Sequence, residues 1–255
     1  MDQYGLIGYP LKHSFSQSYF NNKFAAEKIN AEYVNFEIAS IKDLPAILKE
    51  HPHLKGLNVT IPYKELVIPY LDNLIDNAKA IGAVNVIKID RSKKKIKLTG
   101  YNSDVIGFEK SIQPSLQPHH KKALVLGTGG AAKAVYFGLK ELGVESVYVS
   151  RRHSREGGNP QSTATTLTYD ELTPEIMAEY TVIVNCTPAG MFPHVDEAPD
   201  IPYQYVTAQH LAYDLLYNPD ETLFMKRCKN QGATVQNGLE MLLLQAFDGW
   251  NFWHS

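Results

Sequence analysis

Apolar positions in the first hundred residues follow two alternating spacings. Short strand-like apolar runs alternate with segments of helical spacing. One such segment begins after Ser16, and another covers residues 43–50. Strands that alternate with helices predict an α/β layer architecture with mostly parallel strands. The strand-like runs are residues 4–8, 32–38, 56–61 and 83–89.

The second half of the chain repeats this pattern after a polar, proline-containing connection at residues 111–122. A buried strand runs directly into a helix over residues 123–143. Residues 151–166 are polar and broken by glycine and proline, so we expect a loop with at most a helical stub where a doubly wound fold usually has a crossover helix. Further strand-like runs cover residues 146–150, 180–185 and 211–216.

The last predicted element is a helix over residues 237–253. Its apolar residues form a wide stripe at helical spacing, which is typical of a helix that faces a core. Gln245 is polar within that setting and stands out. The stripe consists of Met241, Leu244, Ala246, Phe247, Trp250 and Trp253.

Composition narrows the classes of protein. The chain has 255 residues, 44% of them hydrophobic, and a formal net charge of -2, so it can bury a core but has no field that attracts nucleic acid or an anionic membrane. Cys186 and Cys228 are too few for a disulfide framework, and the nine histidines lack metal-ligand spacing. With no signal-peptide pattern, we expect a cytoplasmic protein without metal.

The segment "VLGTGGAAKA" carries candidate cofactor chemistry. Gly127, Gly129 and Ala132 occupy the small-residue positions of the dinucleotide-binding fingerprint G-x-G-x-x-A. The first allows a tight turn, the second lets the backbone approach a pyrophosphate, and the third lets helix and strand pack closely. A strand before the turn and a helix after it are the context that this motif requires.

Basic residues at the end of the next strand indicate which dinucleotide binds. An NAD site normally has Asp or Glu there, whereas this strand ends at Ser150 and continues with Arg151 and Arg152, with Arg155 just beyond. Guanidinium groups favour a 2′-phosphate, so we expect NADP. For Arg152 or Arg155 taken singly, an exposed basic loop is an equal alternative.

Polar residues in the first half gather at strand ends and turns, where α/β sheets bind ligands. Each has a simpler explanation alone: the serines could cap helices, and a lone lysine usually faces solvent. Together they favour a site, since a lysine can donate a proton to a developing alkoxide beside a carboxylate. The set is Ser14, Ser16, Asn58, Thr60, Lys64, Asn85, Asn102 and Asp104.

Eight motifs, in order, resemble the shikimate dehydrogenase family over nearly the whole chain. The resemblance implies NADP-dependent interconversion of 3-dehydroshikimate and shikimate in aromatic amino-acid biosynthesis. It also implies two α/β domains flanking a cleft, the second a Rossmann-like doubly wound parallel sheet. Residues 1–102 with 238–255 would bind substrate, and residues 103–237 would bind NADP. The motifs are GYPLKHSFS, NVTIPYK, IGAVNVI, GYNSDVIGF, VLGTGGAAKA, NCTPAGM, DLLYNP and NGLEMLLLQA.

The resemblance assigns roles position by position. Lys64 and Asp104 would form the catalytic pair, and Ser14 and Ser16 would bind the substrate carboxylate. The substrate's other contacts would come from Asn58, Thr60, Asn85, Asp104, Tyr217 and Gln245. The cofactor would be held by Gly127, Gly129, Gly130, Ala131, Ser150, Arg151, Arg155, Thr187, Leu215 and Gly238.

Departures from the family pattern and two rival readings stay open. Gln17 stands where the family commonly has proline, Ser103 where it has threonine, and Ser150 where asparagine is common. One alternative is a quinate/shikimate dehydrogenase with broader substrate or NAD use. The other is a non-catalytic NADP-sensing module, which would have no need of Lys64 and Asp104. The sequence is compatible with a monomer or a homodimer.

Overall fold

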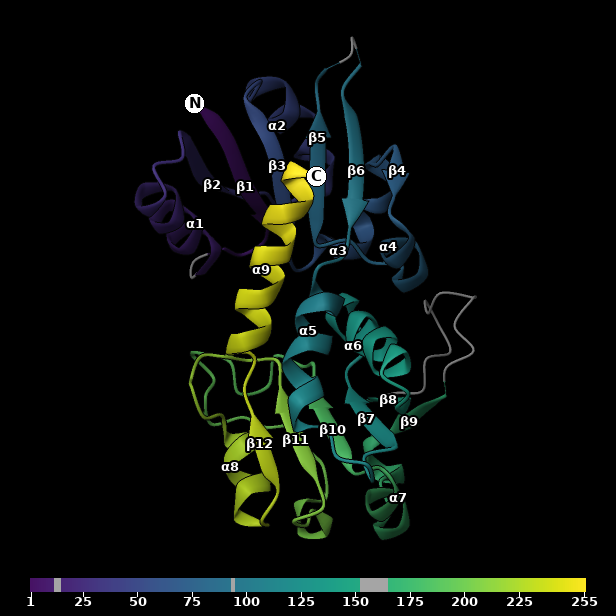
Figure 1. The fold of residues 1–255 in the computed structure, drawn as a ribbon. Coiled ribbons are helices and arrows are strands. Elements are labelled where there is room, and N and C mark those ends of the chain that lie inside the picture. The colour runs from purple at the N-terminus through teal and green to yellow at the C-terminus, as the bar shows by residue number, and fades with distance from the viewer. Residues whose placement is uncertain (12–14, 93–94, 152–164) are drawn as a thin grey trace. The chain divides into compact units, whose positions relative to one another are not determined.

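The computed structural model describes residues 1–11, 15–92, 95–151 and 165–255 (Figure 1). The chain forms two compact units, Met1–Ser103 with Ala246–Ser255, and Asp104–Gln245. Each unit contains helices and one sheet, and all strand pairs of the second sheet are parallel. The predicted fold class of two α/β domains with a Rossmann-like second sheet is confirmed, while the cleft stays a prediction.

Within the described residues, the first unit is built on six strands in the order β2-β1-β3-β5-β6-β4. β1 is parallel to β2 and β3, whereas β5 is antiparallel to β3 and β6. The amino end of β5 therefore lies at the same edge as the carboxyl ends of β3 and β6. The strands are β1 (Asp2–Gly8), β2 (Ala31–Glu37), β3 (Leu54–Val59), β4 (Asn73–Leu74), β5 (Val86–Asp90) and β6 (Lys97–Tyr101).

Both faces of this sheet are apolar and covered. Ile7 and Leu57 face a cluster that includes side chains of α2, while Tyr4 and Leu6 face a cluster that includes α1 and the last turns of α9. The alternation along β1 follows from the two-residue period of a strand. The helices are α1 (Phe15–Ala26), α2 (Leu44–Glu50), α3 (Tyr63–Leu66), α4 (Asp76–Ile81) and α9 (Leu239–His254), with short 3₁₀ turns at Ile41–Asp43 and Ile68–Tyr70.

The last turns of α9 pack tightly on the first sheet. Trp253 lies against Gly56, where an added Cβ would be 2.4 Å from the indole nitrogen, and its Nε1 donates to the carbonyl of Ile87 at 3.0 Å. The prediction that this apolar stripe faces a core is wrong at Phe247, which is 55% exposed. Phe247 is one residue, and hence about 100°, beyond buried Ala246 on the helix.

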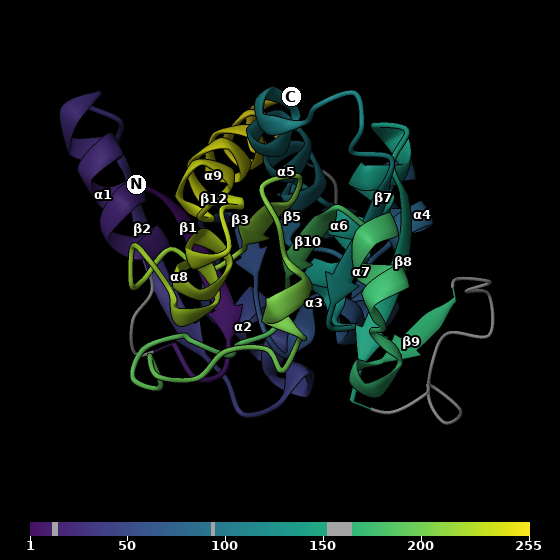
Figure 2. The same ribbon diagram turned by 90° about the horizontal axis from the view of Figure 1, so that it is seen from below.

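The second unit has six described strands in the order β12-β11-β10-β7-β8-β9. All pairs are parallel, so the carboxyl ends of these strands lie at one edge. Figure 2 shows β9 at the outer edge beside β8. The strands are β7 (Lys122–Leu126), β8 (Glu145–Ser150), β9 (Thr166–Thr168), β10 (Val182–Asn185), β11 (Leu211–Asp214) and β12 (Thr234–Gln236).

Helices pack on both faces of the second sheet, as in a doubly wound fold. Val125 faces a cluster with α5, α6 and the start of α9, and its neighbour Leu124 faces a cluster with α7 and α8. Strands buried on both faces explain the continuous apolar runs in this half. The helices are α5 (Asp104–Ile112), α6 (Gly130–Glu141), α7 (Pro174–Glu179) and α8 (Leu223–Asn230), with 3₁₀ turns at Gln113–Ser115, Tyr169–Glu171 and Tyr203–Tyr205. Across the described parts of the chain, no helix has the length and apolar character needed to span a membrane.

Candidate active site

Three strand ends bring predicted polar residues to one edge of the first sheet. Asn58 is near the carboxyl end of β3, Asn102 directly follows β6, and Asn85 directly precedes β5. Because β5 runs antiparallel to its neighbours, its amino end meets their carboxyl ends. The first unit therefore gathers Asn58, Asn85 and Asn102 as the sequence predicts.

Side-chain hydrogen bonds join this edge to Ser103, within the first unit. Asn85 donates from Nδ2 to Ser103 Oγ at 3.0 Å, and the Ser103 backbone N–H donates to Asn85 Oδ1 at 2.7 Å. Asn58 Nδ2 donates to the backbone carbonyl of Asn85 at 3.3 Å. Asn85 thus holds the chain one residue before Asp104, a positioning effect that the sequence does not reveal.

Lys64 lies on α3, a one-turn helix just beyond β3. Pro62 precedes this helix, and buried Tyr63 anchors it by donating its hydroxyl proton to the carbonyl of Ile38 at 2.5 Å. The Lys64 carbonyl accepts a hydrogen bond from the N–H of Val84 at 2.8 Å, beside Asn85. The backbone of Lys64 is therefore tied to the same sheet edge, and its side chain is half-buried.

Thr60 follows β3, and its position depends on a glycine. A Cβ on Gly8 would lie 2.4 Å from Thr60 Cγ2, so only glycine lets the chain after β3 pass the end of β1 this closely. The Thr60 N–H donates to the carbonyl of Ile7 at 3.0 Å. Ser16 lies in the first turn of α1, and Ser14 lies outside the described residues.

In the second unit, Asp104 and Gln245 lie on two helices in contact. Asp104 opens α5 and is 6% exposed, and Gln245 is on α9. The helices approach closely at Gly107, where a Cβ would lie 2.6 Å from the carbonyl oxygen of Met241 and 2.9 Å from Gln245 Cβ. Pairing of Lys64 with Asp104 stays a prediction.

The glycine turn has the conformation that its motif requires. Gly127 has φ +107°, a left-handed conformation that favours glycine, and its N–H donates to the carbonyl of Val149 at 2.8 Å. Gly129 precedes α6, and a Cβ added there would have no protein atom within 4 Å. Gly130 and Ala131 form the first turn of α6, and Ala132 is fully buried. The turn therefore fits a dinucleotide pyrophosphate at the helix N-terminus.

The other predicted cofactor residues follow neighbouring strands at the same edge. The strand order reverses between β7 and β10, and doubly wound sheets bind ligands at such a switch point. Thr187 follows β10 and has its Cγ2 3.4 Å from the Cβ position of Gly127. Leu215 follows β11. Tyr217, which was predicted to bind substrate, lies two residues further on, and burial raises the pKa of its hydroxyl. Ser150 ends β8, exposed Arg151 follows it, and Arg152 and Arg155 lie outside the described residues.

Comparison with known proteins decides the family. The family model for the shikimate dehydrogenase substrate binding domain matches residues 6–87. Shikimate dehydrogenase (NADP(+)) of Carboxydothermus hydrogenoformans is 39% identical over 257 residues, which is 96% of this chain and 90% of that protein. The chain belongs to the shikimate dehydrogenase family. The family and enzyme class expected from the resemblance, an oxidoreductase, are confirmed.

Solved structures with similar folds contain different bound ligands. Shikimate 5-dehydrogenase from Thermus thermophilus, in complex with NADP(H) and shikimate, has a TM-score of 0.82, 29% identity, and coverage of 99% of this chain and 93% of that chain. Quinate dehydrogenase from Corynebacterium glutamicum, in complex with NAD, has a TM-score of 0.84, 27% identity, and coverage of 99% and 93%. The shikimate dehydrogenase fold alone therefore does not choose between these substrates.

The sequence did not predict a buried carboxylate, Asp214, at the carboxyl edge of the second sheet. Asp214 accepts from Thr222 Oγ1 at 2.6 Å, Asn185 Nδ2 at 3.0 Å and the Leu216 N–H at 3.1 Å. Asn185 Oδ1 in turn accepts from the N–H and hydroxyl of Thr187. Burial raises the Asp214 pKa from 3.8 to about 6. Asn185 and Asp214 open the motifs NCTPAGM and DLLYNP, so their signal was present in the sequence.

Gly238 closes the same edge. Its N–H donates to the carbonyl of Leu216 at 2.9 Å, and a Cβ on Gly238 would lie 2.1 Å from the Leu215 carbonyl oxygen. Any larger residue would therefore push away the loop after β11.

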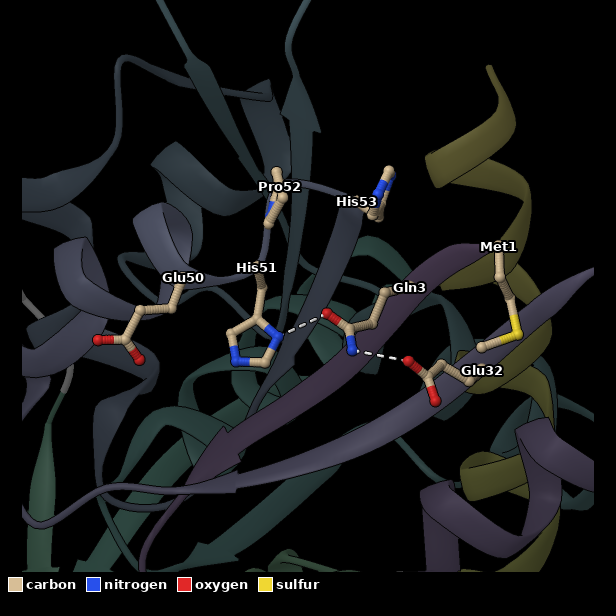
Figure 3. A pocket seen from close by; sticks show the side chains of 7 residues that line it. All are labelled: Met1, Gln3, Glu32, Glu50, His51, Pro52 and His53. Carbon is tan, nitrogen blue, oxygen red and sulfur yellow. Dashed lines mark hydrogen bonds between the residues drawn. The ribbon is translucent and has the colours of Figure 1, made fainter.

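An open pocket of about 270 Å³ lies at the opposite edge of the first sheet, at the amino ends of β1 and β3. Figure 3 shows His51 Nδ1 against Gln3 Oε1 at 2.8 Å, and Gln3 Nε2 donating to Glu32 Oε1 at 2.8 Å. This pocket contains none of the predicted site residues. Across residues 1–11, 15–92, 95–151 and 165–255, no group of three or more His, Cys, Asp or Glu side chains could hold a metal ion.

Proposed function

We propose that this protein catalyses the NADP-dependent, reversible reduction of 3-dehydroshikimate to shikimate. The observation that carries the proposal is 39% identity to a shikimate dehydrogenase (NADP(+)) across 96% of the chain. The polar edge of the first unit and the glycine turn of the second supply the two kinds of site that this reaction needs. We further propose that the enzyme works in the cytoplasm, as a monomer or homodimer.

The two ligands divide between two domains in this proposal. Residues 1–102 with 238–255 bind the substrate, and residues 103–237 bind NADP. The family model for a substrate-binding domain, which matches residues 6–87, supports the first assignment. The positive φ of Gly127 and the open side of Gly129 support the second.

Substrate is held by neutral polar groups in the first domain. Ser14 and Ser16 bind the carboxylate, since hydroxyl groups donate to anionic oxygens. Asn58, Thr60 and Asn85 bind the ring hydroxyls. Asp104, Tyr217 and Gln245 complete the contacts from α5, the loop after β11, and α9. The convergence of Asn58 and Asn85 at one sheet edge supports this assignment.

Lys64 and Asp104 handle the proton. In the direction of ketone reduction, Lys64 donates a proton to the oxygen that develops negative charge, and Asp104 orients the ammonium group and takes part in its reprotonation. In the reverse direction the pair removes the hydroxyl proton. Two hydrogen bonds at the polar edge of the first sheet support the proposal. The Val84 N–H donates to the carbonyl of Lys64, and the Ser103 N–H donates to Asn85 Oδ1.

When bound, NADPH would supply the hydride in reduction, and NADP⁺ would accept it in oxidation. Gly127, Gly129, Gly130 and Ala131 bind its pyrophosphate through the turn and the N-terminus of α6. Ser150, Arg151 and Arg155 bind the 2′-phosphate. Thr187, Leu215 and Gly238 would lie along the ribose and nicotinamide. The buried pair of Asp214 and Asn185 holds Thr187 through its N–H and hydroxyl.

The test is a matrix of two substrates and two cofactors. Purified protein is incubated with shikimate or quinate and with NADP⁺ or NAD⁺, and formation of reduced nicotinamide is followed. We expect the highest kcat/KM with shikimate and NADP⁺. Faster turnover with quinate and NAD⁺ would favour a quinate/shikimate dehydrogenase, the second candidate. The fold similarity to quinate dehydrogenase supports that candidate. No turnover with any pair would favour an NADP-sensing module and would contradict the proposal.

A further inference from the structure

Tyr33 is a buried residue of β2 that no motif singled out. It is 1% exposed, and its ring stacks on Phe20 of α1 with centroids 4.8 Å apart and an interplanar angle of 11°. Asn21 accepts from the Tyr33 N–H at 2.9 Å and donates to its carbonyl at 3.0 Å. Among the described strands β2 is the last at this side of the sheet, so Asn21 makes the hydrogen bonds that a neighbouring strand would make and fixes the position of Tyr33.

The Tyr33 hydroxyl determines how Asn58 is oriented. It donates to Asn58 Oδ1 at 2.7 Å. The opposite end of the same amide, Nδ2, donates to the backbone carbonyl of Asn85 at 3.3 Å. An amide whose oxygen faces a donor and whose nitrogen faces a carbonyl has one satisfactory orientation.

This arrangement leaves part of the Asn58 amide for a ligand. The nitrogen has two N–H groups, and the carbonyl of Asn85 takes one of them. Among the residues that the structure describes, the Asn58 side chain has Tyr33 and Asn85 as its hydrogen-bond partners. The second N–H therefore stays available at the sheet edge where substrate is proposed to bind.

Ser16 meets the same hydroxyl. Burial raises the pKa of Tyr33, so the phenol stays protonated, and the Ser16 side chain lies near enough to act on that pKa in the opposite direction, as a hydrogen-bond donor would. Since the Tyr33 proton is committed to Asn58 Oδ1, the phenol oxygen is left as an acceptor for the Ser16 hydroxyl. One buried phenol thus contacts two residues that are proposed to bind the substrate.

We propose that Tyr33 is a positioning residue for the substrate: it aims the second N–H of Asn58 into the site and holds the Ser16 hydroxyl beside it until substrate binds. This inference rests on the proposed function, in which Asn58 and Ser16 bind shikimate. Tyr33 acts through these two side chains and takes no part in proton or hydride transfer.

Tyr33→Phe removes the hydroxyl and leaves the stacked ring. Asn58 then loses one of the two hydrogen bonds that fix its amide orientation, and the Ser16 hydroxyl loses the phenol oxygen as an acceptor. We expect the KM for shikimate to rise about five- to tenfold, the effect of one lost hydrogen bond, while kcat changes less than about twofold. The KM for NADP⁺ should not change.

Tyr4→Phe is the matched control. Tyr4 belongs to the same buried cluster, is 4% exposed, and its hydroxyl is 3.2 Å from His254 Nε2. We expect it to lower the thermal midpoint by a similar amount and to leave the KM for shikimate unchanged. A structural effect of losing a buried hydroxyl would appear equally in both variants.

A double-mutant cycle with Asn58→Ala tests the route. In the Asn58→Ala background, Tyr33→Phe should raise KM by less than about twofold, because the side chain that it positions is gone. An additive effect in the double variant would contradict action through Asn58.

The outcomes separate this inference from the proposed function. If the wild-type enzyme does not turn over shikimate, the proposed function fails and the inference fails with it. If the wild-type enzyme is active and Tyr33→Phe has an unchanged KM, the inference alone is overturned. A Tyr33→Phe protein that does not fold would assign the hydroxyl to stability and would also overturn it.

Discussion

At the scale of single residues, Lys64 carries the proton transfer of the proposed reaction. Lys64→Ala removes the proton donor but keeps the hydrogen bond from the Val84 N–H to the backbone carbonyl of residue 64 in α3. We expect kcat to fall by about 10²–10⁴, the usual contribution of a general acid, with little change in the KM for shikimate. Steady-state kinetics with saturating NADP⁺ measures both parameters.

Lys55→Ala is the control for Lys64. Lys55 lies on β3 near its amino end, its side chain is 48% exposed, and its 4.0 Å contact with Asp2 is a surface ion pair of small energy. This variant should keep wild-type kcat and KM. An unchanged kcat in Lys64→Ala would remove Lys64 from the proton step.

Residues also show where prediction from sequence reaches its limit. Asn58, Thr60, Lys64 and Asn85 could be predicted because they stand at strand ends in recognisable motifs. Tyr33 could not, because an aromatic residue in a strand is ordinarily core, and its hydroxyl acts only through the register that brings β2 near Asn58.

At the scale of elements, α6 offers a test of the cofactor site with a glycine at each end. Gly129 precedes the helix, and a Cβ there would contact no protein atom within 4 Å. Gly129→Ala should therefore change stability little and raise the KM for NADP⁺ about tenfold or more, since the methyl group takes the space that the pyrophosphate backbone contact needs.

Gly143 follows the other end of α6, and its substitution is expected to affect stability rather than the KM for NADP⁺. Its φ is +74°, so Gly143→Ala strains the backbone and should lower the free energy of unfolding by about 1–2 kcal/mol. The KM for NADP⁺ should stay unchanged. If both variants altered stability alone, the turn at Gly129 would lose its proposed role.

The elements themselves were mostly predictable from spacing. Alternation along residues 4–8 and 56–61 and the continuous apolar runs of the second half correspond to β1, β3, β7 and β10. The basic tip between two strand-like runs in residues 90–102 predicts a hairpin, and the antiparallel pairing of β5 with β6 agrees with it. The antiparallel pairing of β5 with β3 was not predictable, because spacing within one strand carries no information about its neighbour. The exposure of Phe247 was missed for a similar reason. Helical spacing shows which residues share a stripe, but not which of them the rest of the protein covers.

At the scale of the whole molecule, buried titratable groups in the second unit make the free energy of unfolding depend on pH. His210 is 2% exposed, accepts from the Thr207 N–H at Nδ1 at 3.0 Å, and has Nε2 2.8 Å from the carbonyl of Met177. Burial lowers the pKa of His210 from 6.5, and it lowers the pKa of His120 as well. The unfolded chain therefore binds protons first, and stability is lost as the pH falls below about 6.5.

Asp214 has the opposite sign. Burial raises its folded pKa from 3.8 to about 6, so the folded chain binds the proton first. Its contribution makes stability rise as the pH falls from about 6 to about 4, and it partly offsets the histidines in that window. Above about pH 6 the histidines act without this opposition.

Two variants separate the opposing titrations in thermal unfolding measured between about pH 5 and about pH 8. His210→Gln keeps a donor for the Met177 carbonyl and should flatten the loss of midpoint below about pH 6.5 relative to the wild type. Asp214→Asn removes the opposing titration and should steepen the loss below about pH 6. His194→Gln, a change at a side chain that is 73% exposed, should follow the wild-type curve. A steeper loss in His210→Gln, or a flatter one in Asp214→Asn, would contradict the assigned signs, because each variant removes one titrating group and leaves the other in place.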